Sequence, residues 1–287
     1  MRVCVVGAGL IGGSLGLALR GHQSIESVVG LGRRAEPLKR GVDIGALDDW
    51  HLDPSKALAE IDVVVLGVPL GAIAEVLRWI APHLPDNAIV TDVGSAKGCV
   101  VNDVTAVFGQ MLSTFVPAHP IAGTEHSGID AAMADLFVNR RVILTPTAAT
   151  SEKATAIVHQ LWALAGASVV EMSVDNHDRM LAMTSHLPHM LAFGLVDLLA
   201  GATDHEEMLR YAAGGFRDFT RIASSDPVMW RDICLGNQAA LLEALAAYRA
   251  DLEVLSEAVA QADGQALEAI FTRAKNTRDA YRHWFET

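Results

Sequence analysis

The chain has 287 residues, and its 22 Lys and Arg against 34 Asp and Glu give a formal net charge of −12 at pH 7. Proteins that bind nucleic acid normally present a basic face, so this balance argues against nucleic acid as a partner. Hydrophobic residues make up 51% and charged residues 20% of the chain, which excludes an intrinsically disordered protein. Single cores stop growing at roughly 250–300 residues, so we expect two domains.

The cysteines and the apolar runs indicate the cellular setting. Cys4, Cys99 and Cys234 lie far apart and form no C-x-x-C pair, which argues against a disulfide framework or a cysteine zinc site and favours the reducing cytoplasm. The longest apolar run, 63–74, is shorter than the roughly 18 residues that a membrane helix needs. We therefore expect a cytoplasmic protein without a membrane partner.

Up to about residue 171, short β-rich runs alternate with helical patterns. We predict strands at 3–6, 27–31, 62–66, 88–92, 115–118, 142–145 and 168–171. Amphipathic stretches such as 70–80 and 152–164 lie between several of these runs. Continuous Val and Ile runs are typical of strands buried on both faces of a parallel sheet, and the alternation indicates βαβ units.

After residue 172 the strand signals almost vanish, and long Ala-, Leu- and Met-rich patterns follow at 179–199, 228–258 and 265–283. We expect turns between them at Gly214-Gly215 and at 225–227. The chain is therefore predicted to hold an α/β domain over 1–171 and an all-helical domain over 172–287, packed directly on each other.

A glycine motif follows the first strand. Gly7-Ala8-Gly9-Leu10-Ile11-Gly12 is a G-x-G-x-x-G that opens a helix. Its glycines permit a tight turn, approach of a pyrophosphate to the backbone, and close helix–strand packing. Glycines at an ordinary βα turn are the alternative, but the strand before and the helix after are the context that indicates a Rossmann-type dinucleotide-binding domain.

The residues after the second strand bear on the choice of cofactor. An NAD site places a carboxylate about 20 residues after the motif, to bond the ribose hydroxyl. That position holds Gly32, followed by Arg33 and Arg34. A glycine leaves room for a 2′-phosphate and arginine binds it well, so we predict NADP as the preferred cofactor. NAD stays open, because Glu36 could reach a ribose.

Two polar side chains are predicted at the carboxyl edge of the sheet, where ligands bind in open α/β folds. Ser95 follows the strand that ends at Asp92, and His119 follows the next strand. Singly, they could be a helix N-cap and a loop residue. Together they suit removal of a proton from a substrate hydroxyl while hydride leaves the same carbon.

The helical part adds His177, the pair His186 and His189, and Arg217 and Arg221. We predict no metal site, because a catalytic zinc needs three protein ligands, none stands at a suitable third position, and Pro188 disturbs the helix between the paired histidines. The two arginines are four residues apart and share a helix face, although surface pairing with carboxylates is an alternative for either.

Five blocks in order resemble the prephenate/arogenate dehydrogenases of tyrosine biosynthesis. They are the glycine motif, DVGSAK (92–97), HPIAGTEHSG (119–128), SHLPH (185–189) and GGFRDFTRIASSDPVMWRD (214–232). The resemblance implies a nucleotide-binding domain followed by a helical domain that forms a homodimer. It also implies oxidative decarboxylation of a cyclohexadienol, in which hydride passes from the hydroxyl-bearing ring carbon to the nicotinamide and the ring becomes a phenol.

The resemblance also implies roles for single residues. His119 matches the catalytic histidine that hydrogen-bonds the ring hydroxyl, Ser95 the serine that orients it, and Arg221 the arginine that binds a substrate carboxylate. Further substrate contacts are implied for His189, Thr124, Glu125 and Trp230. Cofactor contacts are implied for Gly7, Gly9, Leu10, Ile11, Gly12, Arg33, Arg34, Pro69 and Gly94.

Several alternatives stay open. Many members keep an acidic residue after the second strand, and its replacement by Gly32 puts NAD in doubt. We expect neither a fused chorismate mutase nor an ACT domain. Prephenate is the predicted substrate, which His189 favours, with arogenate or both as the alternative. A binding module without catalysis would lack the serine–histidine pair, and β-hydroxyacid dehydrogenases rely on a lysine where this chain has histidines.

Overall fold

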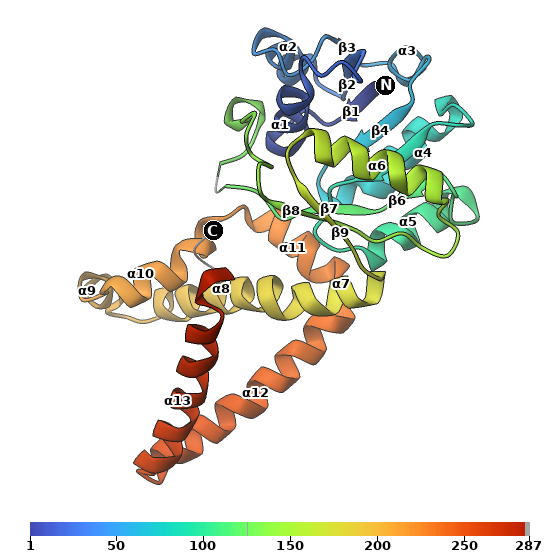
Figure 1. The fold of residues 1–287 in the computed structure, drawn as a ribbon. Helices are drawn as coiled ribbons and strands as arrows, with labels where there is room; N and C mark the ends of the chain where they lie inside the picture. Colours follow the sequence, from blue (N-terminus) through green and yellow to red (C-terminus); the bar gives the residue numbers. More distant parts are fainter. Residues whose placement is uncertain (125, 285–287) are drawn as a thin grey trace. The chain divides into compact units, whose positions relative to one another are not determined.

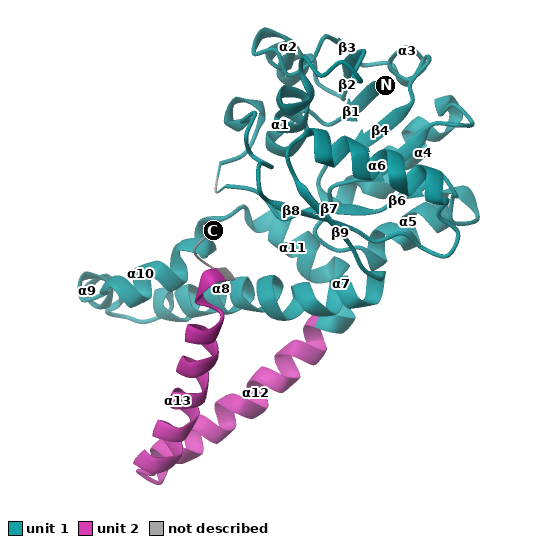
Figure 2. Ribbon diagram, viewed as in Figure 1, with its two compact units in different colours: residues 1–240 teal, residues 241–287 magenta. Residues whose placement is uncertain are grey.

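The computed structural model describes residues 1–124 and 126–284. The chain forms two compact units, Met1–Ala240 and Leu241–Thr287 (Figure 2). The first contains the strands of the described residues and the helices up to residue 236. The second contains most of α12 (Gln238–Ala260) together with α13 (Gly264–Ala280). The predicted domain boundary at 171/172 differs from this division into compact units and stays a prediction.

The first unit is built on a six-stranded parallel sheet. Its strand order is β3-β2-β1-β4-β5-β6, which is the order of a Rossmann fold and confirms the predicted fold class. The strands are β1 (Arg2–Val6), β2 (Ser27–Leu31), β3 (Asp49–His51), β4 (Val63–Leu66), β5 (Ile89–Asp92) and β6 (Phe115–Val116). The three-residue β3 was not predicted, because so short a strand shows no periodicity.

Alternation along each strand fills two cores. In β1, Val3 and Val5 face a core with Leu15 and Trp162, whereas Cys4 and Val6 face a core on the other side of the sheet. Side chains of a strand point to opposite faces in turn, so helices must cover both faces (Figure 1). These helices are α1 (Leu10–Leu19), α2 (Ala35–Asp43), α3 (Pro54–Ala57), α4 (Ile73–Ile80), α5 (Gly98–Phe108) and α6 (Glu152–Leu164).

The predicted strand at 115–118 is wrong as a single strand. It divides at Pro117, which has no N–H to continue the ladder with β5. The carbonyl of Pro117 instead accepts from the N–H of Thr145 at 2.9 Å. The chain then enters β7 (Ala118–Pro120), which pairs antiparallel with β8 (Arg141–Leu144), itself parallel to β9 (Ser168–Glu171). His119 therefore lies within a strand of a second sheet, not after a strand of the first.

The helical part of this unit begins with α7 (Val174–Leu181), a π-helical turn η4 (Ala182–His186) and α8 (Leu187–Ala200). Pro188 has no N–H for the carbonyl of Thr184, and the N–H of Leu187 reaches back five residues to the carbonyl of Ala182. The wide turn confirms that Pro188 disturbs this helix. Such π-bulges are frequent at functional sites.

The remaining helices correct two predictions. Gly214 and Gly215 do not form a turn but begin α10 (Gly214–Thr220). The stretch 228–258 is not one helix, since α11 (Pro227–Gly236) ends at Asn237, whose φ of −115° and ψ of 37° interrupt the helix before α12. The predicted turn at 225–227 is confirmed, with Asp226 capping α11. The short elements between are α9 (His205–Arg210) and η5 (Arg221–Ser224). Across the described residues, no helix is long and apolar enough to cross a membrane.

Gly12 and Gly9 provide a matched test of this packing. A Cβ on Gly12 would lie 2.5 Å from the Gly7 carbonyl oxygen and 2.7 Å from Cγ1 of Val5, whereas one on Gly9 would meet nothing within 4 Å. Gly12→Ala should therefore lower the free energy of unfolding by about 1–3 kcal/mol through overpacking, and Gly9→Ala should leave it nearly unchanged. Urea titration of both variants measures this. Equal losses would contradict the packing role given to Gly12.

Candidate active site

The glycine turn between β1 and α1 has the geometry that a dinucleotide requires. Gly7 adopts a φ of +93°, and an added Cβ would meet the Gly67 carbonyl oxygen at 2.8 Å. The space beside Gly9 is open, and Gly12 packs directly on Gly7. Helix α1 begins after Gly9 with no side-chain cap and no acidic residue in its first turn. Its first N–H groups are thus available to a pyrophosphate.

The other predicted cofactor contacts lie at the same edge of the parallel sheet. Leu10 and Ile11 form the first, half-buried turn of α1. Pro69 lies exposed after β4 and caps η1 (Leu70–Ala72). Gly94 follows β5 and donates its N–H to Oδ2 of Asp92 at 2.7 Å. The structure thus brings these residues to the carboxyl ends of β1, β4 and β5, where Rossmann folds bind ligands.

The residues after β2 present two arginines, one of which already has a partner. A Cβ added at Gly32 would lie 3.5 Å from the Leu38 side chain, which is an ordinary van der Waals contact. Nη1 of Arg33 lies 3.0 Å from Oε1 of Glu75, on the first turn of α4, with both side chains largely exposed. Arg34 is exposed and is the N-cap residue of α2.

A buried ion pair ties the two sheets together beside the site. Asp92 and Lys97 are both fully buried, and the Lys97 ammonium pairs with Oδ2 of Asp92. The ammonium also donates to the Ala118 carbonyl at 2.8 Å, and the N–H of Ala118 donates to Oδ1 of Asp92 at 3.1 Å. Together with the hydrogen bond from the N–H of Gly94, these contacts leave neither charge unpaired. A buried ion pair is tolerated only when both charges are compensated in this way. The same contacts anchor β7, and with it His119.

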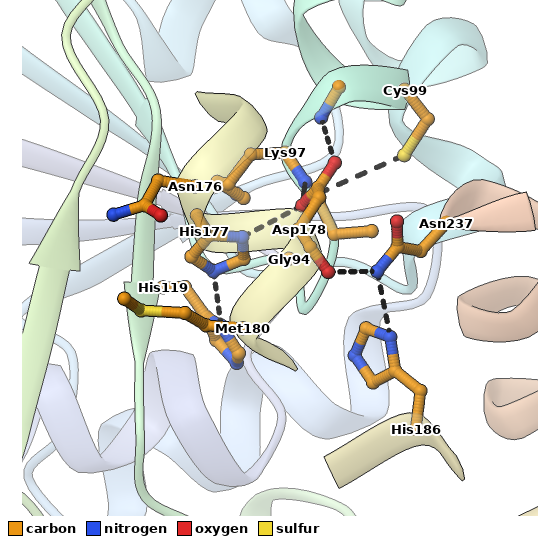
Figure 3. A network of polar contacts seen from close by, with 12 residues as sticks. Gly94, Lys97, Cys99, His119, Asn176, His177, Asp178, Met180, His186 and Asn237 are labelled. Atoms are coloured by element: carbon orange, nitrogen blue, oxygen red, sulfur yellow. Dashed lines mark hydrogen bonds and ion pairs between the residues drawn. The ribbon is translucent and has the colours of Figure 1, made fainter. Parts of the chain in front are cut away.

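His119 ends a chain of hydrogen-bonded side chains (Figure 3). Its Nδ1 lies 2.9 Å from Nε2 of His177, and Nδ1 of His177 lies 2.7 Å from Oδ1 of Asp178. All three side chains are buried. Burial, followed by the nearby His177, Lys97 and His186, holds the pKa of His119 well below its usual value. His119 is therefore neutral at pH 7 and able to accept a proton.

Ser95 lies half-buried in the loop between β5 and α5. Its hydroxyl makes no hydrogen bond to His119 within residues 1–124 and 126–284, and the side chain that hydrogen-bonds His119 is His177. The loop itself is held by Asp178, which accepts the N–H groups of Lys97 and Gly98 at 2.8 Å each. The predicted role of Ser95 in orienting His119 stays a prediction.

A second cluster lies where η4 and α8 meet α11. The ring of His189 stacks on Trp230 with centroids 3.7 Å apart, and His186 meets the same indole edge-on at 6.2 Å. Burial lowers the pKa of His189, with a further contribution from nearby Arg221. The structure thus brings His189, Trp230 and Arg221 together. The Trp230 indole N–H and Nε2 of His186 are buried without a hydrogen-bond partner in the described part of the chain.

The loop after β7 holds the last predicted contacts. Thr124 is exposed, and its hydroxyl accepts the N–H of His126 at 3.2 Å. It lines a groove together with Gly123 and Met133. Within the described residues, the side chain of Thr124 makes no hydrogen bond to His119 or His189. Glu125 lies outside the described residues.

Sequence reasoning missed four residues of this site: Asp92, Lys97, Asp178 and Asn237. Asn237 donates from Nδ2 to the Asp178 carbonyl at 2.8 Å, and the same amide lies 3.0 Å from Nδ1 of His186. A signal was present for Asp92 and Lys97, since two opposite charges flank Ser95 directly after a buried strand. His177 was noticed without a role, and nothing local connects it to His119, which lies 58 residues away.

His186 and His189 each have one ring nitrogen in a hydrogen-bonding contact with the protein. Nδ1 of His186 meets Asn237, and Nδ1 of His189 lies 2.8 Å from the Ser185 carbonyl oxygen. Among the residues that the structure describes, no group of three or more His, Cys, Asp or Glu is arranged to hold a metal ion. The prediction that the site takes no metal is left as a prediction.

Comparison with known proteins places both halves of the chain. Residues 15–171 match the family model "Prephenate dehydrogenase, nucleotide-binding domain", and residues 173–273 match "Prephenate dehydrogenase, dimerization domain". The cyclohexadienyl dehydrogenase of Zymomonas mobilis is 37% identical over 286 residues, covering 98% of this chain and 96% of the relative.

Two solved structures extend the similarity to the whole fold. The prephenate dehydrogenase of Aquifex aeolicus, in complex with hydroxyphenyl propionate and NAD⁺, is 36% identical with a TM-score of 0.89, covering 98% of each chain. The arogenate dehydrogenase of Synechocystis is 32% identical with a TM-score of 0.83, covering 98% of this chain and all of that one.

His186 should make the stability of the protein depend on pH. Burial, opposed by the Asp178 carboxylate, lowers its pKa from 6.5 to about 4, so below pH 6.5 the unfolded chain binds more protons than the folded one. Between pH 7 and pH 5 this single site should remove about 2 kcal/mol from the free energy of unfolding. His186→Asn keeps an acceptor for Asn237 but cannot titrate.

Urea titrations at the two pH values measure the effect. The loss of stability between pH 7 and pH 5 should be about 2 kcal/mol smaller in His186→Asn than in the wild type. His159→Asn, at an exposed position of α6, should keep the wild-type loss. Equal losses in all three proteins would contradict the lowered pKa of His186.

Proposed function

The chain belongs to the prephenate dehydrogenase family, and from this premise we propose that it converts prephenate to 4-hydroxyphenylpyruvate by oxidative decarboxylation. The observation that carries the proposal is His119, a buried and neutral histidine whose Nδ1 is held by His177. Its strand, β7, is tied through Ala118 to Lys97 and Asp92 at the carboxyl end of β5. A bound nicotinamide dinucleotide would supply the hydride acceptor. The glycine turn fits its pyrophosphate.

His119 is suited to the hydroxyl of the substrate ring. As hydride leaves the hydroxyl-bearing carbon and carbon dioxide leaves the opposite carbon, the ring becomes aromatic. A neutral imidazole accepts the hydroxyl proton while this happens and returns it to the phenol oxygen, so His119 ends unchanged. Its lowered pKa keeps the accepting form present at neutral pH. Aromatisation drives the reaction, and no strong acid is required.

The second cluster is suited to the carboxylates of the substrate. Arg221 supplies a cation near His189, which is fixed by its stacking on Trp230. The unpartnered N–H of Trp230 is buried beside them, and a buried polar atom of this kind normally meets a ligand or water. We assign substrate contacts to Arg221, His189 and Trp230, with Ser95 and Thr124 as further candidates.

Arogenate, alone or together with prephenate, is the alternative substrate. The relatives bear the names of all three activities: prephenate, cyclohexadienyl and arogenate dehydrogenase. The two substrates differ only in a keto or an amino-acid side chain, so the ring chemistry at His119 is common to both.

Turnover of the wild type and of one variant tests the proposal. Absorbance of reduced nicotinamide should rise with prephenate in the presence of NADP or NAD. His119→Asn should lower kcat by about 10²–10⁴-fold, because a general base is lost, while the exposed control His159→Asn should retain it. Absence of turnover with prephenate and with arogenate, under either cofactor, would contradict the proposed function.

We further propose that NADP is preferred over NAD. Gly32 leaves space at the ribose position, and Arg33 and Arg34 are both on the exposed turn that follows β2. Because Glu75 already pairs with Arg33, Arg34 is the cation with the fewer competing contacts. Glu75 should therefore weaken NADP binding, and Arg34 should strengthen it.

Two variants with opposite effects measure this preference. Arg34→Ala should raise KM for NADP about 10-fold through loss of a charge-assisted contact, with little change for NAD. Glu75→Gln frees Arg33 and should lower KM for NADP. A wild type that uses NAD better than NADP, with neither variant changing the ratio, would contradict the preference.

A homodimer formed through the helical part, residues 172–287, is proposed as the assembly. Within the second unit, Val259 is 66% and Phe271 59% exposed, and α13 has no buried residue. Exposed apolar side chains on two long helices are typical of an interface. Light scattering should give twice the 30.6 kDa of one chain, and Phe271→Asp should shift the protein to monomer. A monomeric wild type at micromolar concentration would contradict this.

A further inference from the structure

The side chains behind His119 determine which of its ring nitrogens carries a proton. The order of contacts is Asp178 Oδ1, His177 Nδ1, His177 Nε2 and His119 Nδ1, with separations of 2.7 and 2.9 Å across the two hydrogen bonds. His177 is fully buried, and Asp178 is 9% exposed. Water therefore competes little for these contacts (Figure 3).

Asp178 is the fixed end of this chain. Burial alone would raise the pKa of its carboxyl, but hydrogen bonds from His177 and from the backbone N–H groups of Lys97 and Gly98 outweigh burial and lower the pKa. An ionised carboxylate only accepts hydrogen bonds. Nδ1 of His177 must therefore carry its proton and donate it to Asp178.

The N–H donor at Nδ1 of His177 determines where the protons lie on the other ring nitrogens of His177 and His119. In neutral His177 the other nitrogen, Nε2, is then an acceptor. The contact at 2.9 Å thus needs a donor on Nδ1 of His119. Because the pKa of His119 is well below its usual value, its ring is neutral at pH 7 and Nε2 is left without a proton. That nitrogen is the one able to accept a proton from a substrate.

Asp178 also holds the loop that carries Ser95. Its two oxygens accept the N–H groups of Lys97 and Gly98, and the Lys97 ammonium contacts the Ala118 carbonyl next to His119. The Asp178 carboxylate on α7 therefore has two roles. It orients the ring of His119 indirectly, through His177, and it holds the Ser95 loop directly. Its position depends on Asn237, which donates to the Asp178 carbonyl.

We propose that His177 and Asp178 are positioning residues that keep Nε2 of His119 unprotonated toward the substrate and stabilise the imidazolium formed when that nitrogen takes the hydroxyl proton. The chemical part of this inference rests on the proposed function. Nε2 gains the proton, Nδ1 keeps its hydrogen bond to His177, and the proton returns to the phenol oxygen. The titratable groups that face His119 are His177 from α7, Lys97 from the loop after β5 and His186 from η4.

The need for Asp178 follows from those neighbours. Burial and the nearby Lys97 ammonium both disfavour a positive charge on His119. A carboxylate reached through His177 supplies the opposite charge without touching the ring, as the aspartate of a Ser-His-Asp triad does for its histidine. Without it the ring would be free to adopt the other tautomer, with Nε2 protonated and unable to act as a base.

Three variants test the kinetic part. His177→Phe keeps the ring shape but removes the acceptor, and it should lower kcat by about 10–10³-fold while KM for prephenate and for NADP stays within about twofold. His177→Gln places an amide oxygen where Nε2 was, and it should recover part of the lost kcat. His159→Phe, at an exposed position of α6, should match the wild type. Circular dichroism and urea titration establish that each variant folds.

The pattern of recovery separates positioning from simple structural damage. Loss of kcat in His177→Phe with partial recovery in His177→Gln supports the inference. Unchanged kcat in a folded His177→Phe overturns it. A fall in kcat/KM that comes entirely from a rise in KM also overturns it.

A second measurement does not depend on turnover. With ¹⁵N-histidine labelling, the His119 ring signals, identified by their absence in His119→Asn, should show Nδ1 protonated and Nε2 bare in the wild type at pH 7. His177→Phe should shift the ring toward the Nε2-protonated form. A wild-type ring protonated on Nε2 overturns the inference. Failure of the wild type to turn over either substrate would instead overturn the proposed function, and the ring signals would still decide the tautomer.

Discussion

The buried ion pair between Asp92 and Lys97 is the contact on which the site depends. Both side chains are fully buried, and losing one partner of such a pair generally costs about 3–5 kcal/mol, because a charge is left uncompensated. Their contacts to Ala118 join the end of β5 in the first sheet to β7 in the second. The loop with Ser95 and the strand with His119 are thereby held at one edge, although they belong to different sheets.

The helical layer supplies what the sheets lack. Asp178 of α7 reaches His119 through His177 and holds the N-terminal turn of α5, while the π-turn before α8 presents His186 and His189 to Trp230. The neutral base His119 and the cation Arg221 therefore come from different layers of the fold. This division suits a reaction that needs a hydride acceptor, a base for one hydroxyl and a cation for carboxylates. In a chain with a net charge of −12, binding of two anionic ligands must come from such local groups.

Local patterns predicted most of the fold but little of the hydrogen bonding in the site. The strands with continuous Val and Ile could be predicted because burial on both faces of a sheet requires apolar residues at successive positions. The glycine motif could be predicted because a tight βα turn requires glycine at particular positions. Pro117 was the visible reason for the break between β6 and β7, yet the run around it was read as one strand. The partner of His119 could not be read, because the contact to His177 joins residues 58 apart through packing alone. Asn237 was hidden for the same reason, inside a pattern that looks uniformly helical.

The central claim is that this site moves hydride from the hydroxyl-bearing ring carbon while carbon dioxide leaves. Prephenate carrying deuterium on that carbon, incubated with oxidised NADP and the wild-type enzyme, tests it most directly by mass spectrometry of both products. We expect deuterium in the reduced nicotinamide, none in 4-hydroxyphenylpyruvate, and carbon dioxide released in equal amount. Deuterium retained in the aromatic product, or reduced nicotinamide formed without carbon dioxide, would contradict it.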